Sequence, residues 1–329
     1  MPLYRKLFKQ SLLITWKNKY LWFFGFFAAL LGNGGDYEII SRVTTNDTSG
    51  QIGWRELVQT NVFSGQSLVT IRDFMAEEPL SFILTLLVGL FILVLTCFLV
   101  WLVNVSQAAL VNNSIAIAAG KTTDFKVGLE TGKKHFWSVL SLNLIAKILT
   151  SLIFVIISFP MILSADRSDA TGNGLLYLLV FMIFIPIAIM LAFIVKYAIA
   201  YKVIKGDDVF ISLGKAWNLF RENWLVSIEM AFALFFINVL FGLIVIFLVL
   251  LLALPFLFLA LVLYYMTSVV GFWLIASLAL IVLLLFIMVA GAASATFQIS
   301  SWSTLFIELT GRGATAKVVR VFGNLVGGK

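Results

Sequence analysis

The sequence predicts an all-α membrane protein, a polytopic bundle of six transmembrane helices that forms a single membrane domain over residues 1–329. Composition is the first observation behind this prediction. The chain is 61% hydrophobic and only 12% charged, with a mean hydropathy of +1.06. A soluble domain is about half apolar and about a quarter charged. So few charges cannot cover a surface that faces water, and lipid is therefore the expected solvent.

Long uncharged runs are the second observation. The run at 82–103 carries no charge and reaches the roughly 20 residues that cross a bilayer as a helix. The basic, aromatic-rich N-terminus lacks a small-x-small cleavage site, so we expect a retained first span and not a removed signal peptide. Apolar stretches between charges predict six spans, near 20–31, 80–103, 137–161, 175–198, 224–253 and 268–297.

The third observation is that, although Arg42, Arg55, Arg72 and Arg167 lie on the other side, every lysine outside these spans falls on one side. They lie before the first span, between the second and third, between the fourth and fifth, and in the tail. The positive-inside rule then places both termini in the cytoplasm of a cell (inner, cytoplasmic) membrane. The basic pI near 9.5 is explained by contact with anionic headgroups of membrane lipids, and no nucleic-acid partner is expected.

Residues 224–298 are the weak point of this topology. They carry one charge, Glu229, and are long enough for three spans, which would put the basic tail outside. Two long spans joined by an outer turn around 255–266 satisfy the charge rule better. We favour six spans and keep seven as the alternative.

Three similar stretches predict an internal repeat with units 1–124, 125–209 and 210–329. Each stretch begins with Phe, is basic and amphipathic, and enters a span after a cation three residues before a Trp. Such a segment forms an interfacial elbow, in which cations meet phosphates and the Trp anchors the turn. The predicted interfacial anchors are Lys19 with Trp22, Lys134 with Trp137, and Arg221 with Trp224.

The ends of the even spans also match. "SQAALVNNSIAIAAGK" (106–121) and "FQISSWSTLFIELTGR" (297–312) align on Gly120 and Gly311, and this alignment places Gln107 opposite Gln298. "KYAIAYKVIKGD" (196–207) is the degenerate middle copy.

Together, the elbows "KKHFWSVL" and "FRENWLVS" and the Gly-terminated even spans resemble a six-helix membrane domain. That domain is found ahead of some bacterial glycerophosphodiester phosphodiesterases and also as stand-alone proteins of unknown role. The resemblance covers nearly the whole chain. No phosphodiesterase barrel follows Lys329 in this sequence, so the resemblance implies the membrane domain and not the enzymatic activity.

No motif predicts enzyme chemistry, a cofactor or a metal site. "AAGKTT" (118–123) lacks the glycine that a phosphate-binding loop needs, because Ile115 stands at that position. The single histidine, His135, lies beside two lysines at the expected interface and excludes a His-pair metal motif. Neither GxSxG nor HExxH occurs. The outer loop 32–78 is acidic and long enough for a lid or for binding a protein partner.

Polar groups at membrane depth are the candidate binding residues: Lys147, Glu229, Asn143, Gln107 and Gln298. Lys147 lies about 16 Å along its helix if that helix starts at Phe136. A lysine at this depth either snorkels to the headgroups, pairs with a carboxylate such as Glu229, or binds an anionic ligand.

Two classes of function follow. The first is a non-enzymatic membrane protein that handles a lipid or amphiphile, or supports a membrane complex. The alternative is a small-solute or ion transporter whose path is lined by Lys147, Glu229, Gln107 and Gln298. The substrate or partner and the oligomeric state are not encoded in any recognisable motif.

In "AGAASAT" (290–296), Ala290 with Ser294 and Gly291 with Ala295 are small residues four apart, which predicts close contact with another span.

Overall fold

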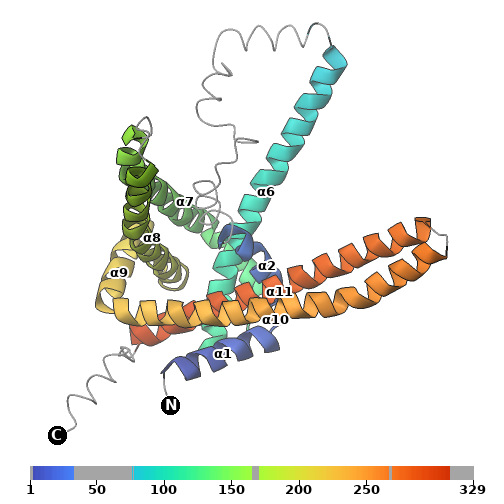
Figure 1. The fold of residues 1–329 in the computed structure, drawn as a ribbon. Coiled ribbons are helices and arrows are strands. Elements are labelled where there is room, and N and C mark those ends of the chain that lie inside the picture. Colours follow the sequence, from blue (N-terminus) through green and yellow to red (C-terminus); the bar gives the residue numbers. More distant parts are fainter. Residues whose placement is uncertain (1–2, 33–75, 77, 165–169, 267–268, 312–329) are drawn as a thin grey trace. The chain divides into compact units, whose positions relative to one another are not determined.

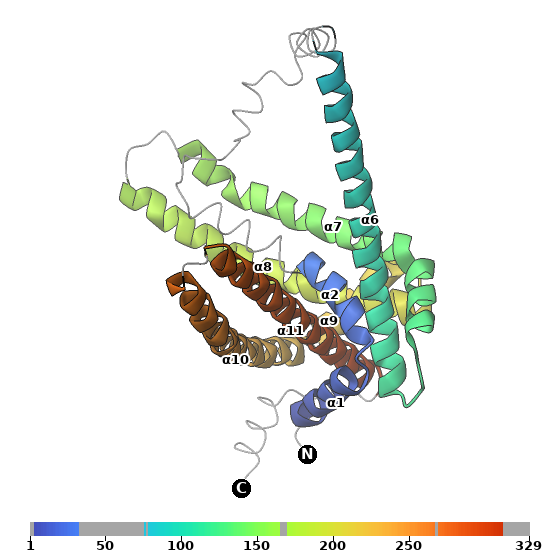
Figure 2. The same cartoon turned by 90° about the vertical axis from the view of Figure 1, so that its right-hand side faces the viewer.

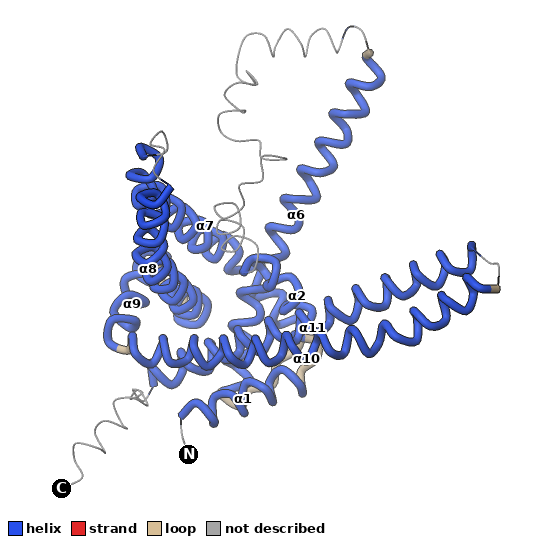
Figure 3. The backbone as a smooth tube through the Cα atoms, in the orientation of Figure 1, coloured by secondary structure: helices blue, strands red, loops and turns tan. Residues whose placement is uncertain are grey.

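The computed structural model describes residues 3–32, 76, 78–164, 170–266 and 269–311. These residues form α-helices and short connections, and no strand occurs among them (Figure 3). Most of the predicted outer loop 32–78 and of the C-terminal tail lies outside the described residues. The chain divides into two compact units, Leu30–Val103 and the remainder, Met1–Ala29 with Asn104–Lys329.

Among the described residues, five helices are long and apolar enough to cross a membrane, which supports a multi-pass helical membrane protein. Their apolar stretches are Pro79–Ala118, Phe125–Ile157, Met182–Lys205, Trp224–Tyr265 and Val269–Gly311. The helices in chain order are α1 (Leu3–Lys17), α2 (Leu21–Gly32), α6 (Pro79–Ala118), α7 (Phe125–Ser164), α8 (Ala170–Lys205), α9 (Val209–Glu222), α10 (Trp224–Tyr265) and α11 (Val269–Gly311) (Figure 1). At the α-helical rise α2 is only about 17 Å long.

The three predicted elbows differ in the structure. The chain leaves the helix between α1 and α2 and again at Asn223, so an amphipathic helix ends before Trp22 and before Trp224 as expected. The middle elbow is different, because α7 continues through Trp137 as one helix of 40 residues.

Residues 224–311 form two helices and not three. The expected turn around 255–266 begins later than predicted, since α10 runs through Pro255 and ends at Tyr265. Helices α10 and α11 pack side by side as an antiparallel hairpin (Figures 1 and 2).

Glycines end two of the even-numbered helices. Gly120 and Gly206 have φ of 80° and 71°, a left-handed conformation that glycine adopts at little steric cost. After α6, the Lys121 amide donates to the Ala116 carbonyl at 2.9 Å and the Gly120 amide to the Ile117 carbonyl at 2.9 Å. These two bonds are the Schellman arrangement, which satisfies the last carbonyls of the helix.

Buried side chains concentrate at one end of the long helices. We call this packed region the base and define it as residues 3–29, 104–143, 193–244 and 290–311. It holds every buried polar side chain of the described residues and nearly all of the buried apolar ones, including Tyr197, Phe24, Leu110 and Leu305. By contrast, no residue of 80–100 or 144–157 is buried.

Three glycines let two pairs of helices, α2 with α11 and α6 with α7, approach closely within the base. A Cβ on Gly25 of α2 would overlap Thr296 of α11, and a Cβ on Gly132 of α7 would overlap the Val105 backbone of α6. A Cβ on Gly128 would lie 2.5 Å from Asn113 Nδ2. The predicted small-residue contact of α11 therefore exists, but Ala292 and Thr296 make the close approach, whereas Gly291 faces open space.

Candidate functional site: polar contacts between the helices

Two of the predicted polar residues meet between α6 and α7. The Asn143 side-chain amide donates to Asn104 Oδ1 at 2.9 Å and to Gln107 Oε1 at 2.8 Å. Asn143 and Asn104 are buried, and Gln107 is half-buried. Both hydrogens of the Asn143 amide are therefore used, each on a carboxamide oxygen of α6. Sequence reasoning found Asn143 and Gln107 but missed Asn104.

A second carboxamide contact joins α10 and α11. Gln298 Nε2 donates to Asn238 Oδ1 at 3.1 Å, and Ser294 Oγ lies 3.4 Å from the same oxygen. Gln107 and Gln298 occupy matching positions in the predicted repeat. Gln107 accepts a hydrogen bond from α7, the next helix, whereas Gln298 donates one to α10, the other helix of its own hairpin. Such interhelical bonds contribute about 0.6 kcal/mol on average in a membrane setting.

Glu229 has a different partner from the lysine considered for it. The Tyr4 hydroxyl of α1 donates a hydrogen bond to Glu229 Oε2, so the first helix of the chain contacts the start of α10. Lys147 is exposed and forms no ion pair or hydrogen bond within the described part of the chain. The structure therefore does not pair Lys147 with Glu229. Sequence reasoning missed Tyr4, since contacts between residues far apart in the chain leave no local pattern.

An exposed lysine of α8 lies over an aromatic ring of α11. Lys196 Nζ lies 4.6 Å from the ring centroid of Trp302, within the range of a cation–π contact. The adjacent Tyr197 is buried, and its hydroxyl lies 2.7 Å from Ser227 Oγ of α10. These contacts join α8, α10 and α11 at the base.

Hydroxyl groups supply further contacts to α11. Ser114 Oγ lies 2.9 Å from Ser300 Oγ, and Ser11 Oγ lies 3.0 Å from Thr304 Oγ1. Thr296 Oγ1 donates to the Leu21 carbonyl at 3.2 Å. Two buried hydroxyls of the base, Ser106 and Ser301, have no hydrogen-bond partner among the described residues.

The predicted interfacial anchors differ in exposure. Trp137 and Trp224 are exposed by 74% and 52%. Trp22 is half-buried, and its indole N–H donates to the Thr15 carbonyl at 2.9 Å, which ties α2 back to α1. The three cations, Lys19, Lys134 and Arg221, are all exposed. An exposed Trp beside an exposed cation is the arrangement that suits a headgroup layer.

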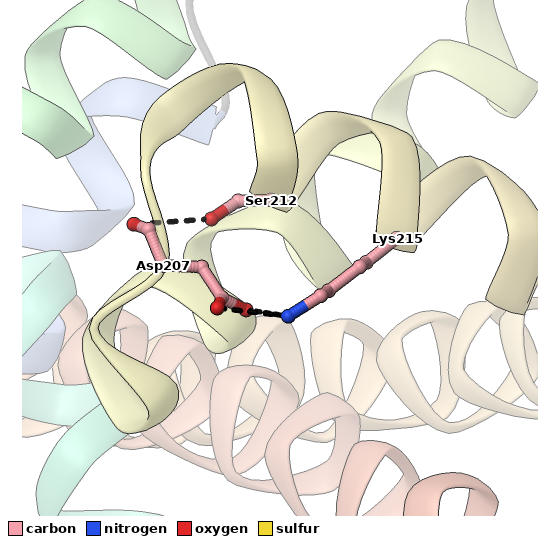
Figure 4. Close-up of polar contacts among 3 residues, drawn as sticks. All are labelled: Asp207, Ser212 and Lys215. Carbon is pink, nitrogen blue, oxygen red and sulfur yellow. Dashed lines mark hydrogen bonds and ion pairs between the residues drawn. The ribbon is translucent and has the colours of Figure 1, made fainter.

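An ion pair closes the connection between α8 and α9 (Figure 4). Lys215 Nζ donates to both carboxylate oxygens of Asp207, at 2.8 and 2.7 Å. The side chain of Ser212 lies 3.4 Å from the Asp207 carbonyl oxygen. Because Lys215 is largely exposed, the pair is worth at most about 1 kcal/mol. It sets the start of α9 and belongs to no binding site.

The Gly-x-x-x-Gly spacing of Gly128 and Gly132 is a local sequence pattern that predicts the contact between α6 and α7. Small residues four apart permit close helix approach, and these two glycines pack α7 onto α6.

Among the described residues no group of three His, Cys, Asp or Glu side chains could hold a metal ion.

Comparison with known proteins adds no family. No family model, curated protein or solved structure matches this chain.

Proposed function

We propose that the chain is a non-enzymatic integral membrane protein that handles a lipid or amphiphile, or supports a membrane complex. The supporting observation is the way the carboxamides meet. Asn143 uses both of its amide hydrogens on Asn104 and Gln107, and Gln298 uses one on Asn238. Groups that bond one another across helix contacts serve to hold helices together, whereas a solute path needs groups that face an open space.

The finer topology is part of the same proposal: six spans in three elbow-and-hairpin repeats, with both termini in the cytoplasm of a cell membrane. It is supported by the two helices of residues 224–311 and by the left-handed glycines after α6 and α8. A protein of this topology is similar to the six-helix membrane domain described above. Reporter fusions to residue 329 test it, and an external C-terminus would contradict it.

One observation favours the alternative of a solute or ion transporter. Glu229 is a half-buried carboxylate in an otherwise uncharged helix, and it bonds to a tyrosine hydroxyl. Carboxylates in apolar helices frequently mark ion or proton pathways.

Lipid co-purification and flux measurements separate the two functions. The full chain is extracted in polymer nanodiscs, and its lipids are identified by mass spectrometry. We expect anionic lipids to be enriched over the bulk membrane, and the enrichment to fall in Lys133→Gln/Lys134→Gln but not in the matched variant Glu130→Gln. Bulk lipid composition in all three proteins would contradict lipid handling. An ion or proton flux into proteoliposomes that Glu229→Gln abolishes would establish the transporter.

A further inference from the structure

Helix α1 has two faces with different surroundings. One face packs on α11, where Leu7 is buried and Ser11 Oγ lies 3.0 Å from Thr304 Oγ1. On the same side, the Tyr4 hydroxyl donates its hydrogen bond to Glu229 at the start of α10. These contacts hold α1 on its compact unit by one face and leave the opposite face uncovered.

The uncovered face of α1 carries cations and apolar side chains but no acid. Residues 3–32 contain no Asp or Glu. Two apolar side chains on this face, Leu12 and Trp16, are 58% and 66% exposed. We call this side of the helix the outward face of α1, and its exposed members are Arg5, Lys6, Lys9, Leu12, Leu13, Trp16 and Lys17. At 3.6 residues per turn these positions fall on one side of the helix.

The spacing of these cations fits a helix that lies along a membrane surface. The longest stretch of α1 without a cation, from Lys9 to Lys17, is about 12 Å long, whereas the hydrocarbon core is about 30 Å thick. The helix therefore cannot cross that core without placing charges in it. A helix with cations, Leu and Trp exposed together lies in the headgroup plane, and its apolar side chains enter the boundary of the acyl chains.

Helix α9 has the same two-faced arrangement but a different charge. Ser212, Ala216 and Leu219 form its buried face, while Phe210 is 80% exposed and Trp217 is exposed beside it. The exposed charged residues of 208–222 are two acids and two cations: Asp208, Glu222, Lys215 and Arg221. Lys215 also donates to both carboxylate oxygens of Asp207. The exposed face of α9 therefore offers apolar contact to a bilayer without net positive charge.

We propose that the outward face of α1 docks on anionic phospholipids of the cytoplasmic leaflet and gathers them beside the protein, whereas α9 contacts lipid without selecting for charge. The proposal rests on the membrane function and the cytoplasmic N-terminus proposed above. Anionic phosphate groups complement the cations, and the acyl boundary takes Leu12, Leu13 and Trp16. Each cation close to an anionic surface strengthens attachment roughly fivefold.

The chain itself favours lipid over an acidic protein as the partner of this face. Only three residues separate the end of α1 at Lys17 from the apolar helix α2, which begins at Leu21. With α2 as the first span, α1 is tethered next to the headgroups. The predicted elbows are then not equivalent, because the first one selects anionic lipid and the one at α9 does not.

Quenching by spin-labelled lipids tests which lipid lies against each helix. In a Cys97→Ser background, Leu12→Cys on α1 and Phe210→Cys on α9 are labelled with an NBD fluorophore in the full chain. The proteins are reconstituted in mixed vesicles of phosphatidylcholine and phosphatidylglycerol. A nitroxide is carried on the acyl chain of one lipid or of the other at equal concentration, and the quenching by the two is compared at each position.

We expect phosphatidylglycerol to quench the label at 12 several-fold more strongly than phosphatidylcholine, and the two lipids to quench the label at 210 equally. The preference at 12 should disappear in Arg5→Gln/Lys6→Gln/Lys9→Gln. The three replaced side chains are exposed, so the melting temperature in detergent should not change. High salt should remove the preference in the protein without these three substitutions, because it screens exposed charges.

Equal quenching by the two lipids at position 12 would overturn the proposal, and so would an equal preference for phosphatidylglycerol at 12 and 210. Absence of quenching by either lipid at 12 would also overturn it, because protein or water would then cover the outward face of α1. Bulk lipid composition in the nanodiscs together with selective quenching at 12 would refute lipid handling but keep this docking surface, so the two proposals fail separately.

Discussion

Gly132 of α7 lies directly against the backbone of Val105 in α6, so close that a Cβ at position 132 would overlap the Val105 carbonyl and lie 2.7 Å from its Cγ1. The contact fixes α7 on α6 one turn after Gly128. It also brings Asn143, three turns further along α7, to Asn104 and Gln107.

The Gly132 contact predicts that Gly132→Ala lowers the stability of the protein. The added methyl forces α7 away from α6, and overpacking of this kind costs about 1–3 kcal/mol. Thermal unfolding in detergent measures the loss. Gly214→Ala is the matched control: its Cβ meets nothing, and alanine is the better helix former by about 1 kcal/mol. Equal melting temperatures for the two variants would contradict the close contact.

The carboxamide contact predicts a loss of stability in Asn143→Ala. This substitution leaves the oxygens of Asn104 and Gln107 without their donor inside the base, at a cost of about 1–3 kcal/mol. Asn218→Ala on the exposed face of α9 should have little effect. If Asn104→Ala lowers stability by the same amount in the Asn143→Ala background as it does alone, the two side chains are not coupled.

Glu229 should be coupled to Tyr4 and not to Lys147. Tyr4→Phe and Glu229→Gln remove the two ends of one hydrogen bond, so the double variant should lose less stability than the sum of the single losses. Lys147→Met should be tolerated, and its effect should add to that of Glu229→Gln, because exposed Lys147 has no partner among the described residues. Non-additive losses for the Lys147 and Glu229 pair would show that the two charges interact.

Replacement of two neighbouring serines of α11 by alanine should change the stability of the protein differently. Ser300 and Ser301 are both fully buried, but only Ser300 has a hydrogen-bond partner, Ser114. Ser300→Ala should lower stability by about 1 kcal/mol. Ser301→Ala removes an unsatisfied buried hydroxyl and should leave stability unchanged or raise it. Chemical denaturation of the two variants provides the comparison, and a loss at Ser301 equal to that at Ser300 would mean that the Ser301 hydroxyl has a partner.

The sequence by itself determined the class of molecule. Apolar composition and uncharged runs depend only on local residues, and they predicted the long helices α6, α7, α8, α10 and α11. The glycine at 120 correctly marked a helix end, since a left-handed cap needs a specific residue at one position. Local pattern also identified Asn143, Gln107, Glu229 and Gln298 as polar groups that require partners.

Tertiary structure alone decided which partners they have. Asn104, Tyr4 and Asn238 bond to residues that lie 39 or more positions away in the chain, and hydropathy does not encode such pairings. Only packing could show that part of each long helix is covered by protein, because a buried apolar residue and a lipid-facing one are equally apolar. That distinction shows that Lys147 is exposed and not covered by a neighbouring helix of the described chain.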